Sequence, residues 1–196
     1  VLDIGCGACS WLKAADEIIQ NQSKKKIVGI EKFYEPDSNL NFHIHNGDFK
    51  NYNLNDLNLN IKFDLSICIE VGEHIKPQDS SHLIKSLTSC SDIVIFGSAT
   101  LRQSGDLHIN TNNHQFWINI FKRYDFEMID IFRAKFWNSD LVPSIIQNTF
   151  LFVKNGSNSA IFKNNTSPLV NIIHPKVMNQ HDLNDFIDTP VYFKKY

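Results

Sequence analysis

A regular alternation of short apolar runs with amphipathic helical segments most constrains the fold of this chain. Strands alternating with helices form βαβ units in a mostly parallel sheet, whose crossovers are right-handed. The sequence therefore predicts an α/β fold of the Rossmann-like kind, with helices on both faces of the sheet as a three-layer sandwich. The expected strands cover residues 1–4, 27–30, 42–45, 63–69, 93–96, 126–132 and 149–153, and the expected helices cover 11–19, 80–87 and 114–121.

Length and composition limit the protein to ordinary α/β classes. The 196 residues, 42% of them hydrophobic and 20% charged, suffice for one domain with a real core. We expect this domain to span residues 1–154, with residues preceding Val1 in the native protein, and a C-terminal extension over residues 155–196. A net charge of -2 argues against a protein that holds long nucleic acid mainly by charge. No apolar run approaches the roughly 18 residues of a membrane span.

Four cysteines raise the question of zinc or redox chemistry, because Cys6 and Cys9 form a CxxC pair. No second such pair follows, and Cys68 and Cys90 lie in apolar runs. We therefore expect reduced, buried thiols in a cytoplasmic protein.

Acidic residues follow each of the first three predicted strands, where ligands of parallel sheets bind. The first strand runs Val1-Leu2-Asp3-Ile4-Gly5-Cys6-Gly7, Glu31 ends the second, and Gly47-Asp48-Phe49 follows the third. The first of these resembles motif I, the D-x-G-x-G signature of class I S-adenosylmethionine (SAM) dependent methyltransferases, and the other two acids stand where that family places its ribose and adenine contacts.

This resemblance, which covers Val1 to about Lys154, implies a seven-stranded sheet with an antiparallel last strand. It also implies SAM as cofactor. Gly5 and Gly7 would allow close approach of its methionine part, Asp3 would hold the ammonium group and Glu31 the ribose hydroxyls. The remaining cofactor contacts would be Asp48 and Phe49 at the adenine, and Glu70.

A nicotinamide-binding Rossmann domain is the nearest competing interpretation. That class requires G-x-G-x-x-G, whereas the third glycine is replaced here by Ser10. The chain departs from the methyltransferase pattern too, since Cys9 stands where many members have a third glycine.

After the fourth strand, the segment Glu70-Val71-Gly72-Glu73-His74 resembles the E-x-x-E-H version of the family. It occurs in ubiquinone-biosynthesis O-methyltransferases and small-RNA 2′-O-methyltransferases, where it supplies metal ligands, and in natural-product and sugar methyltransferases. The N/D-P-P-Y segment of amino N-methyltransferases is different, which disfavours methylation of bases and glutamine.

This segment suggests a divalent metal, with magnesium expected. Positions i, i+3 and i+4 share one face of a helical turn, so Glu70, Glu73 and His74 would be ligands, with His108 as a possible fourth. The alternative is a metal-free site in which Glu73 orients His74 as general base. His74 and His108 are the candidate catalytic bases.

The segment after the fifth strand, Gly105-Asp106-Leu107-His108-Ile109-Asn110 followed by Phe116-Trp117, resembles bacterial methyltransferases of polysaccharide and glycan assembly. The alternative is that His108 and Asn110 cap the helix that opens near Asn112. We expect Phe116, Trp117 and residues 136–142 at the acceptor pocket, although the two aromatic residues also suit the core.

Taken together, these residues predict transfer of the SAM methyl group to a hydroxyl of a small-molecule or glycan-precursor acceptor. Two alternatives stay open. RNA 2′-O-methylation is permitted by the E-x-x-E-H segment and disfavoured by the near-neutral charge. A non-catalytic partner subunit with this fold is disfavoured by the intact motif acids.

Overall fold

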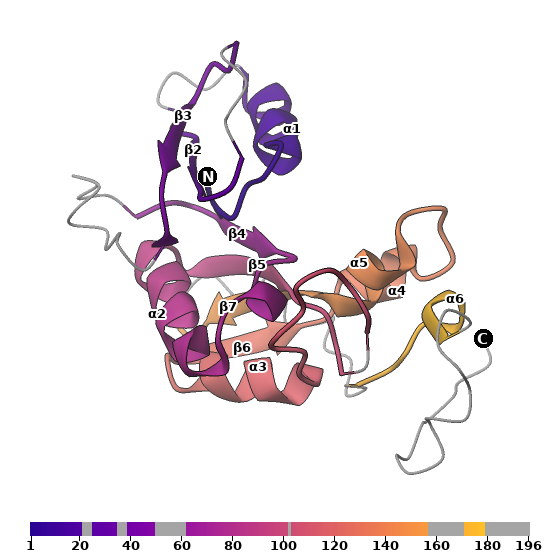
Figure 1. The fold of residues 1–196 in the computed structure, drawn as a ribbon. Helices are drawn as coiled ribbons and strands as arrows, with labels where there is room; N and C mark the ends of the chain where they lie inside the picture. The colour runs from indigo at the N-terminus through magenta and orange to yellow at the C-terminus, as the bar shows by residue number, and fades with distance from the viewer. Residues whose placement is uncertain (21–24, 35–38, 50–61, 102, 157–170, 179–196) are drawn as a thin grey trace.

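The computed structural model describes residues 1–20, 25–34, 39–49, 62–101, 103–156 and 171–178. Seven strands form one sheet in the order β3-β2-β1-β4-β5-β7-β6 (Figure 1). The strands are β1 (Leu2–Ile4), β2 (Val28–Glu31), β3 (His43–Asn46), β4 (Ser66–Ile69), β5 (Ile93–Gly97), β6 (Phe126–Ile129) and β7 (Thr149–Lys154). All neighbouring pairs are parallel except β5–β7 and β6–β7. The predicted Rossmann-like sheet with an antiparallel last strand is confirmed.

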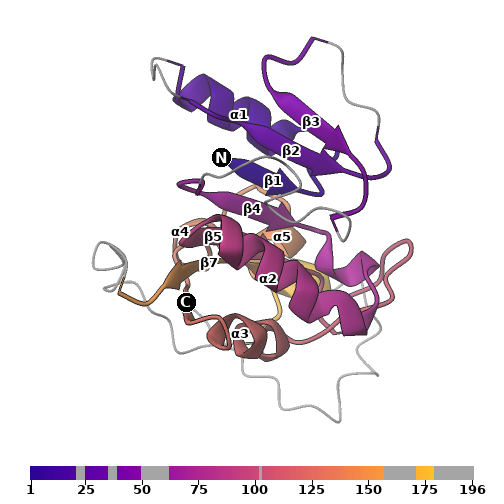
Figure 2. The ribbon, with the colours of Figure 1, turned by 90° about the vertical axis from the view of Figure 1, so that its left-hand side faces the viewer.

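Helices cover both faces because the strand order reverses at β1 and β4. A right-handed crossover from β1 to β2 and one from β4 to β5 run in opposite directions along the sheet, so they place α1 (Ser10–Ile18) and α2 (Ser80–Cys90) on opposite faces. The helix α3 (His114–Lys122) packs beside α2 (Figure 2). This pair covers the main core.

Strand β7 shows how the two faces are filled. Phe150 and Phe152 point into the main core, whereas Leu151 and Val153 join a smaller cluster on the other face, which includes Phe132. Successive side chains of a strand point to opposite faces, so a continuous apolar run is what a strand buried on both sides requires.

Two short helices between β6 and β7 were not predicted. The expected strand over residues 126–132 ends at Ile129 and is followed by α4 (Phe132–Phe136) and α5 (Pro143–Asn148). Each has fewer than two turns, too short for apolar periodicity to appear in the sequence. The strand expected over residues 63–69 begins only at Ser66, and Phe63 makes a single bridge to Ser91.

Part of the C-terminal extension packs back on the domain. Residues 171–178, which include α6 (Pro175–Met178), contact α5 and the start of α3. His174 N–H donates to Gln147 Oε1 at 2.6 Å, and Asn171 N–H donates to His114 Nδ1 at 3.2 Å. Among the described helices, none is long and apolar enough to cross a membrane.

Candidate functional site

The parallel strands end at one edge of the sheet, and the segments that follow them bring the predicted residues together. Gly5 and Gly7, after β1, have positive φ angles of 77° and 48°, a conformation that glycine adopts without steric cost. A Cβ on Gly5 would lie 2.3 Å from Val71 Cγ2. The loop therefore lies directly against the segment that follows β4, and only glycine fits there.

Asp3 is a buried acid with an unsatisfied oxygen. It is 1% exposed, and its Oδ2 has no hydrogen-bond partner. Burial, together with the nearby Glu31 carboxylate, raises the pKa of Asp3 to about 7. A buried carboxylate with an unpartnered oxygen is stabilised by a cationic group, which supplies both a positive charge and hydrogen-bond donors.

Glu31, at the end of β2, is buried but well bonded. Its Oε2 accepts from Gly7 N–H at 2.7 Å, and its Oε1 accepts from Lys32 and Phe33 N–H, both at 2.8 Å. The carboxylate thus ties the glycine loop to the turn after β2. The lone pairs that remain are acceptors for a diol.

The segment after β3 is placed less simply. Asp48 lies two residues after the end of β3 and pairs with Lys32 Nζ at 3.1 Å. Phe49, predicted to cover the adenine ring, is 7% exposed and packs in the main core, 6.2 Å from the His82 ring. A contact of Phe49 with adenine stays a prediction.

The E-x-x-E-H segment does not form the single helical turn that was expected. Glu70 has φ 57°, outside the helical region, and the 3₁₀ turn η2 (Gly72–His74) begins only two residues later. Glu70 therefore does not share a helical face with Glu73 and His74. Its Oε1 is buried without a partner, and burial, with Glu73 nearby, raises its pKa to about 7.

Glu73, His74 and His108 meet. One ligand atom of each lies within 4.8 Å of the other two, and the two imidazole rings are 5.0 Å apart. Glu70 is not in this group, so the structure brings together three of the four predicted metal ligands. The loop after β5 reaches η2 because Glu73 O accepts from Ile109 and Asn110 N–H, at 2.8 and 3.0 Å.

Both histidines are held in the same way. His74 Nδ1 lies 3.3 Å from Leu107 O, and His108 Nδ1 lies 3.1 Å from Gln103 O. A carbonyl oxygen only accepts, so each Nδ1 carries a proton, and Nε2 is the ring nitrogen that does not take part in this bond. A Cβ on Gly105 would lie 2.3 Å from the His108 ring, so this imidazole position depends on a glycine there.

Glu73 anchors the group from inside the protein. It is 0% exposed, and its carboxylate accepts from Ser98 Oγ at 3.1 Å and from Ala99 N–H at 3.2 Å. The two segments after β4 and β5 are therefore joined by both the side chain and the carbonyl of this residue.

The acceptor-pocket residues are placed differently from expectation. Trp117 is 2% exposed and packs on Phe96 in the core, with ring centroids 4.9 Å apart, and Phe116 is partly buried against the same core. The core interpretation is therefore correct for Trp117. The helix cap is also not His108 or Asn110. Asn113 caps α3, accepting from Phe116 N–H at 3.0 Å, while Asn110 donates to Gly72 O and Ser80 Oγ.

All four cysteines are free and buried. The Sγ atoms of Cys6 and Cys9 are 3.7 Å apart, and burial raises the pKa of both thiols. Cys9 has φ 62°, which explains why a glycine suits this position in the family.

The comparisons with solved structures identify the fold. The magnesium protoporphyrin IX methyltransferase of Synechocystis PCC 6803 with bound SAH matches with a TM-score of 0.52 and 14% identity, over 79% of this chain and 73% of that one. The chain has the fold of SAM-dependent methyltransferases. No protein-family model and no curated protein matches the sequence.

Other matches with this fold differ in size and activity. Human N-acetylserotonin methyltransferase in complex with SAM matches at TM-score 0.50 and 14% identity, over 78% of this chain and 46% of that one. A pericyclic reaction enzyme matches at TM-score 0.50 and 9% identity, over 79% of this chain and 42% of that one. The chain thus spans less than half of each of these two. A methyltransferase fold hosts more than one chemistry, so activity must be argued from the site.

Some site residues had no sequence signal. Ser98, Gln103 and Asn148 are polar residues in or beside apolar runs, and their contacts join segments far apart in the chain. Such residues belong to no recognisable sequence motif, and only the structure shows which groups they contact.

Proposed function

We propose that this protein is a SAM-dependent methyltransferase that methylates a hydroxyl of a small-molecule or glycan-precursor acceptor. The observation that carries the proposal is Asp3, a buried acid with an unpartnered oxygen, next to a second buried acid and a glycine loop. A ligand with a cationic amine and a diol satisfies both acids, and SAM has both.

The residues around β1 and β2, which we call the cofactor half of the site, fit this ligand. Asp3 would hold the ammonium group, Glu31 would accept from the ribose hydroxyls, and Asp48 would accept from the adenine amino group. Gly5 and Gly7 leave room for close approach of the ligand to the backbone. When bound, SAM supplies a methyl group activated by its sulfonium charge. The protein orients this group toward the acceptor, and such positioning is worth roughly 7 to 11 kcal/mol in ideal cases.

The residues around β5 and β7, which we call the acceptor half of the site, lie beside the histidines that would accept the hydroxyl proton. His74 and His108 each donate Nδ1–H to a backbone carbonyl, and Nε2 of each ring takes no part in this bond. A neutral imidazole fixed in this tautomer is a suitable base for the hydroxyl proton. The apolar residues Leu107 and Ile109, which flank His108, are exposed at the same loop.

A divalent metal would fit Glu73, His74 and His108. Metal-bound histidines usually donate their other N–H to a carbonyl or carboxylate, as both histidines do here. One carboxylate with two imidazoles suits Zn²⁺, Fe²⁺ or Mn²⁺ better than Mg²⁺, which prefers oxygen. A metal here would lower the pKa of the hydroxyl. Glu70 stays a candidate further ligand or a cofactor contact.

The decisive experiment combines binding with product analysis. Calorimetry should show SAM binding, and mass spectrometry of an acceptor panel with labelled SAM should show a product carrying one added methyl group. Absence of SAM binding would reject the proposal. Binding without any labelled product across hydroxylated acceptors would favour a non-catalytic subunit.

The role of the metal is tested separately. Full activity in excess chelator, with no metal found by elemental analysis, would leave the histidines as bases. Loss of activity that Mn²⁺ or Zn²⁺ restores would establish the metal, and His108→Ala should then abolish that restoration.

A further inference from the structure

A chain of side-chain amides, two of them buried, runs from the C-terminal segment to the loop that carries His108. His174 N–H donates to Gln147 Oε1 at 2.6 Å, and Gln147 Nε2 donates to Asn148 Oδ1 at 2.9 Å. Asn148 Nδ2 then donates to Gln103 Oε1 at 2.8 Å. The backbone carbonyl of Gln103 in turn accepts from His108 Nδ1. Three residues, joined by four hydrogen bonds, thus link His174 to the candidate base His108.

The direction of every bond in this chain is fixed by its partners. Asn171 N–H donates to His114 Nδ1, so that nitrogen is the acceptor and His114 Nε2 carries the proton. His114 Nε2 lies 3.3 Å from Asn148 Oδ1 and donates to it. Asn148 Oδ1 therefore receives two donors, and its amide nitrogen must face Gln103.

Burial makes this arrangement costly to change. Gln147 is 0% exposed, Asn148 is 2% exposed and His114 is 3% exposed. Burial, followed by the charge of Arg133, lowers the pKa of His114 to about 4, so the ring is neutral near pH 7. Rotating one of these amides by 180° would place its N–H donors against other donors, and the free-energy cost of this is higher inside a protein than in water.

Gln103 is the link to the site. Its side chain is held by Asn148 and by Thr100 N–H, at 2.8 and 3.4 Å, and its own N–H donates to Thr100 O. Gln103 is thus held by its own N–H and by its side chain. The carbonyl of Gln103 selects the Nδ1–H tautomer of His108 and sets the direction of its Nε2.

We propose that Asn148 and Gln103 are positioning residues, which hold His108 in one tautomer and one place from the start of β7. This inference rests on the proposed function only for the catalytic or metal-binding role of His108. Neither residue contacts the histidine pair through its side chain, and neither was a candidate from the sequence.

The test uses two variants of the full chain, Asn148→Ala and Gln103→Met, which keeps the length of the side chain but removes its acceptor. The matched control is Asn119→Ala, because Asn119 also accepts from a side-chain amide, Gln115 Nε2, at 2.9 Å, but on the exposed side of α3. The readouts are the ¹⁵N spectrum of the histidine rings, the affinity for Co²⁺ alone, and the affinity for SAM.

We expect both variants to lose the single Nδ1–H signature of His108 and to bind Co²⁺ about ten- to a hundredfold more weakly, the usual cost of losing an outer-shell partner. SAM affinity and the control should not change. Variants that keep the His108 spectrum and Co²⁺ affinity while only the melting temperature falls would overturn the proposal.

The two proposals fail separately. A wild-type chain without SAM affinity would reject the methyltransferase, and one without Co²⁺ affinity would reject the metal. In both cases the ring spectrum of His108 still decides whether Asn148 and Gln103 position it.

Discussion

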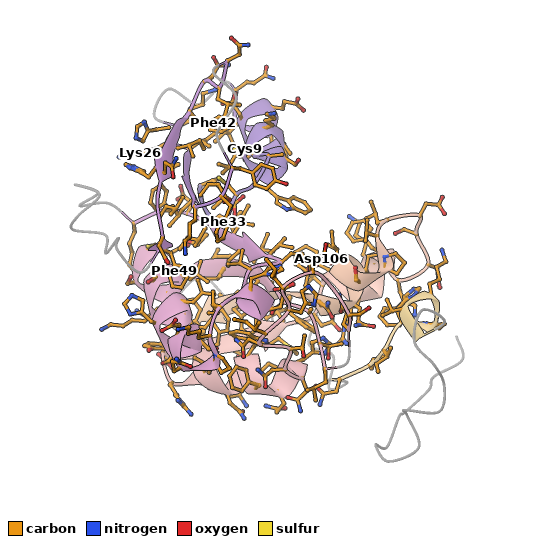
Figure 3. The ribbon with its side chains drawn as sticks, in the orientation of Figure 1. Cys9, Lys26, Phe33, Phe42, Phe49 and Asp106 are labelled. Carbon is orange, nitrogen blue, oxygen red and sulfur yellow. The ribbon has the colours of Figure 1, made fainter. Side chains whose placement is uncertain are left out.

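Asp3 and the Gln147–Asn148 amide pair, on the two halves of the site, differ in whether their hydrogen bonds are complete. On the cofactor half, around β1 and β2, Asp3 is buried with an oxygen that has no partner. On the acceptor half, around β5 and β7, the amides of Gln147 and Asn148 are buried with their partners present. A buried acid such as Asp3, which lacks a partner, is prepared to bind a charged ligand, whereas an amide pair whose partners are present is prepared to hold a neighbouring group in place. Figure 3 shows Phe33 and Asp106, which lie on these two halves.

The largest effect should come from Asp3→Asn. Loss of the charge should weaken SAM binding about a hundredfold or more, since a charged hydrogen bond contributes up to roughly 3 kcal/mol. The ligand-free protein should become more stable at pH 8, on the order of 1–3 kcal/mol, because an unpartnered buried charge is removed.

The sign of that gain follows from the raised pKa. Folding disfavours ionisation of Asp3, so its contribution to stability falls as the pH rises from the ordinary 3.8 to about 7. Thermal melts should therefore show a larger stabilisation at pH 8 than at pH 5. If Asp3→Asn binds SAM as tightly as the wild type, Asp3 is not the residue that binds the charged ligand.

Glu31→Gln should give the opposite stability change. SAM affinity should fall about ten- to a hundredfold. The protein should also lose about 1–2 kcal/mol, because the carboxylate accepts from Gly7, Lys32 and Phe33 N–H and one of these acceptors becomes a donor. Denaturant melts beside calorimetry measure both. An unchanged free energy of unfolding would mean that the turn after β2 does not depend on this side chain.

SAM affinity should depend on pH through Asp3. The ammonium group needs the ionised carboxylate, whose pKa is about 7 in the ligand-free protein. Binding should therefore weaken about fivefold from pH 7 to pH 6, because the protonated carboxyl must release its proton when SAM binds. The slope should disappear in Asp3→Asn. A slope that persists in that variant would assign the proton to another group.

The smallest effect should come from Cys9→Gly. Glycine relieves the positive φ of 62° but removes a thiol that is 2% exposed, and the two terms oppose each other. The free energy of unfolding should change by less than about 1 kcal/mol, and SAM affinity should not change. A large loss in either would show that the Cys6–Cys9 contact shapes the glycine loop.

The same comparison explains how far the sequence could be interpreted. The candidate cofactor residues are acids and glycines in or just after strands, so Asp3, Glu31 and Asp48 could be proposed from their position and the family pattern. The sheet was predictable because its strands are continuous apolar runs. The antiparallel placement of β7 came only from the family resemblance.

The acceptor half could not be predicted as well, because it is made by contacts between distant segments. Glu70 was expected to share a helical face with His74, but its φ of 57° breaks the turn, and no residue type announces that conformation. Trp117 was expected at the pocket and lies in the core, since an aromatic residue on a helix suits either place. Asn148 could not be singled out from the sequence, because its proposed role depends on contacts with residues far away in the chain.

The position of β7 has a consequence for the order in which the site is assembled. This strand is the last among the described residues, yet it lies between β5 and β6, and Asn148 immediately precedes it. During synthesis, the glycine loop and Glu31 can meet once the chain as far as Asn46, the end of β3, has left the ribosome. His108 cannot be fixed until about 40 later residues have followed it and β7 has inserted, because such non-local pairing closes late. A nascent or truncated chain would therefore acquire its cofactor half well before its acceptor half.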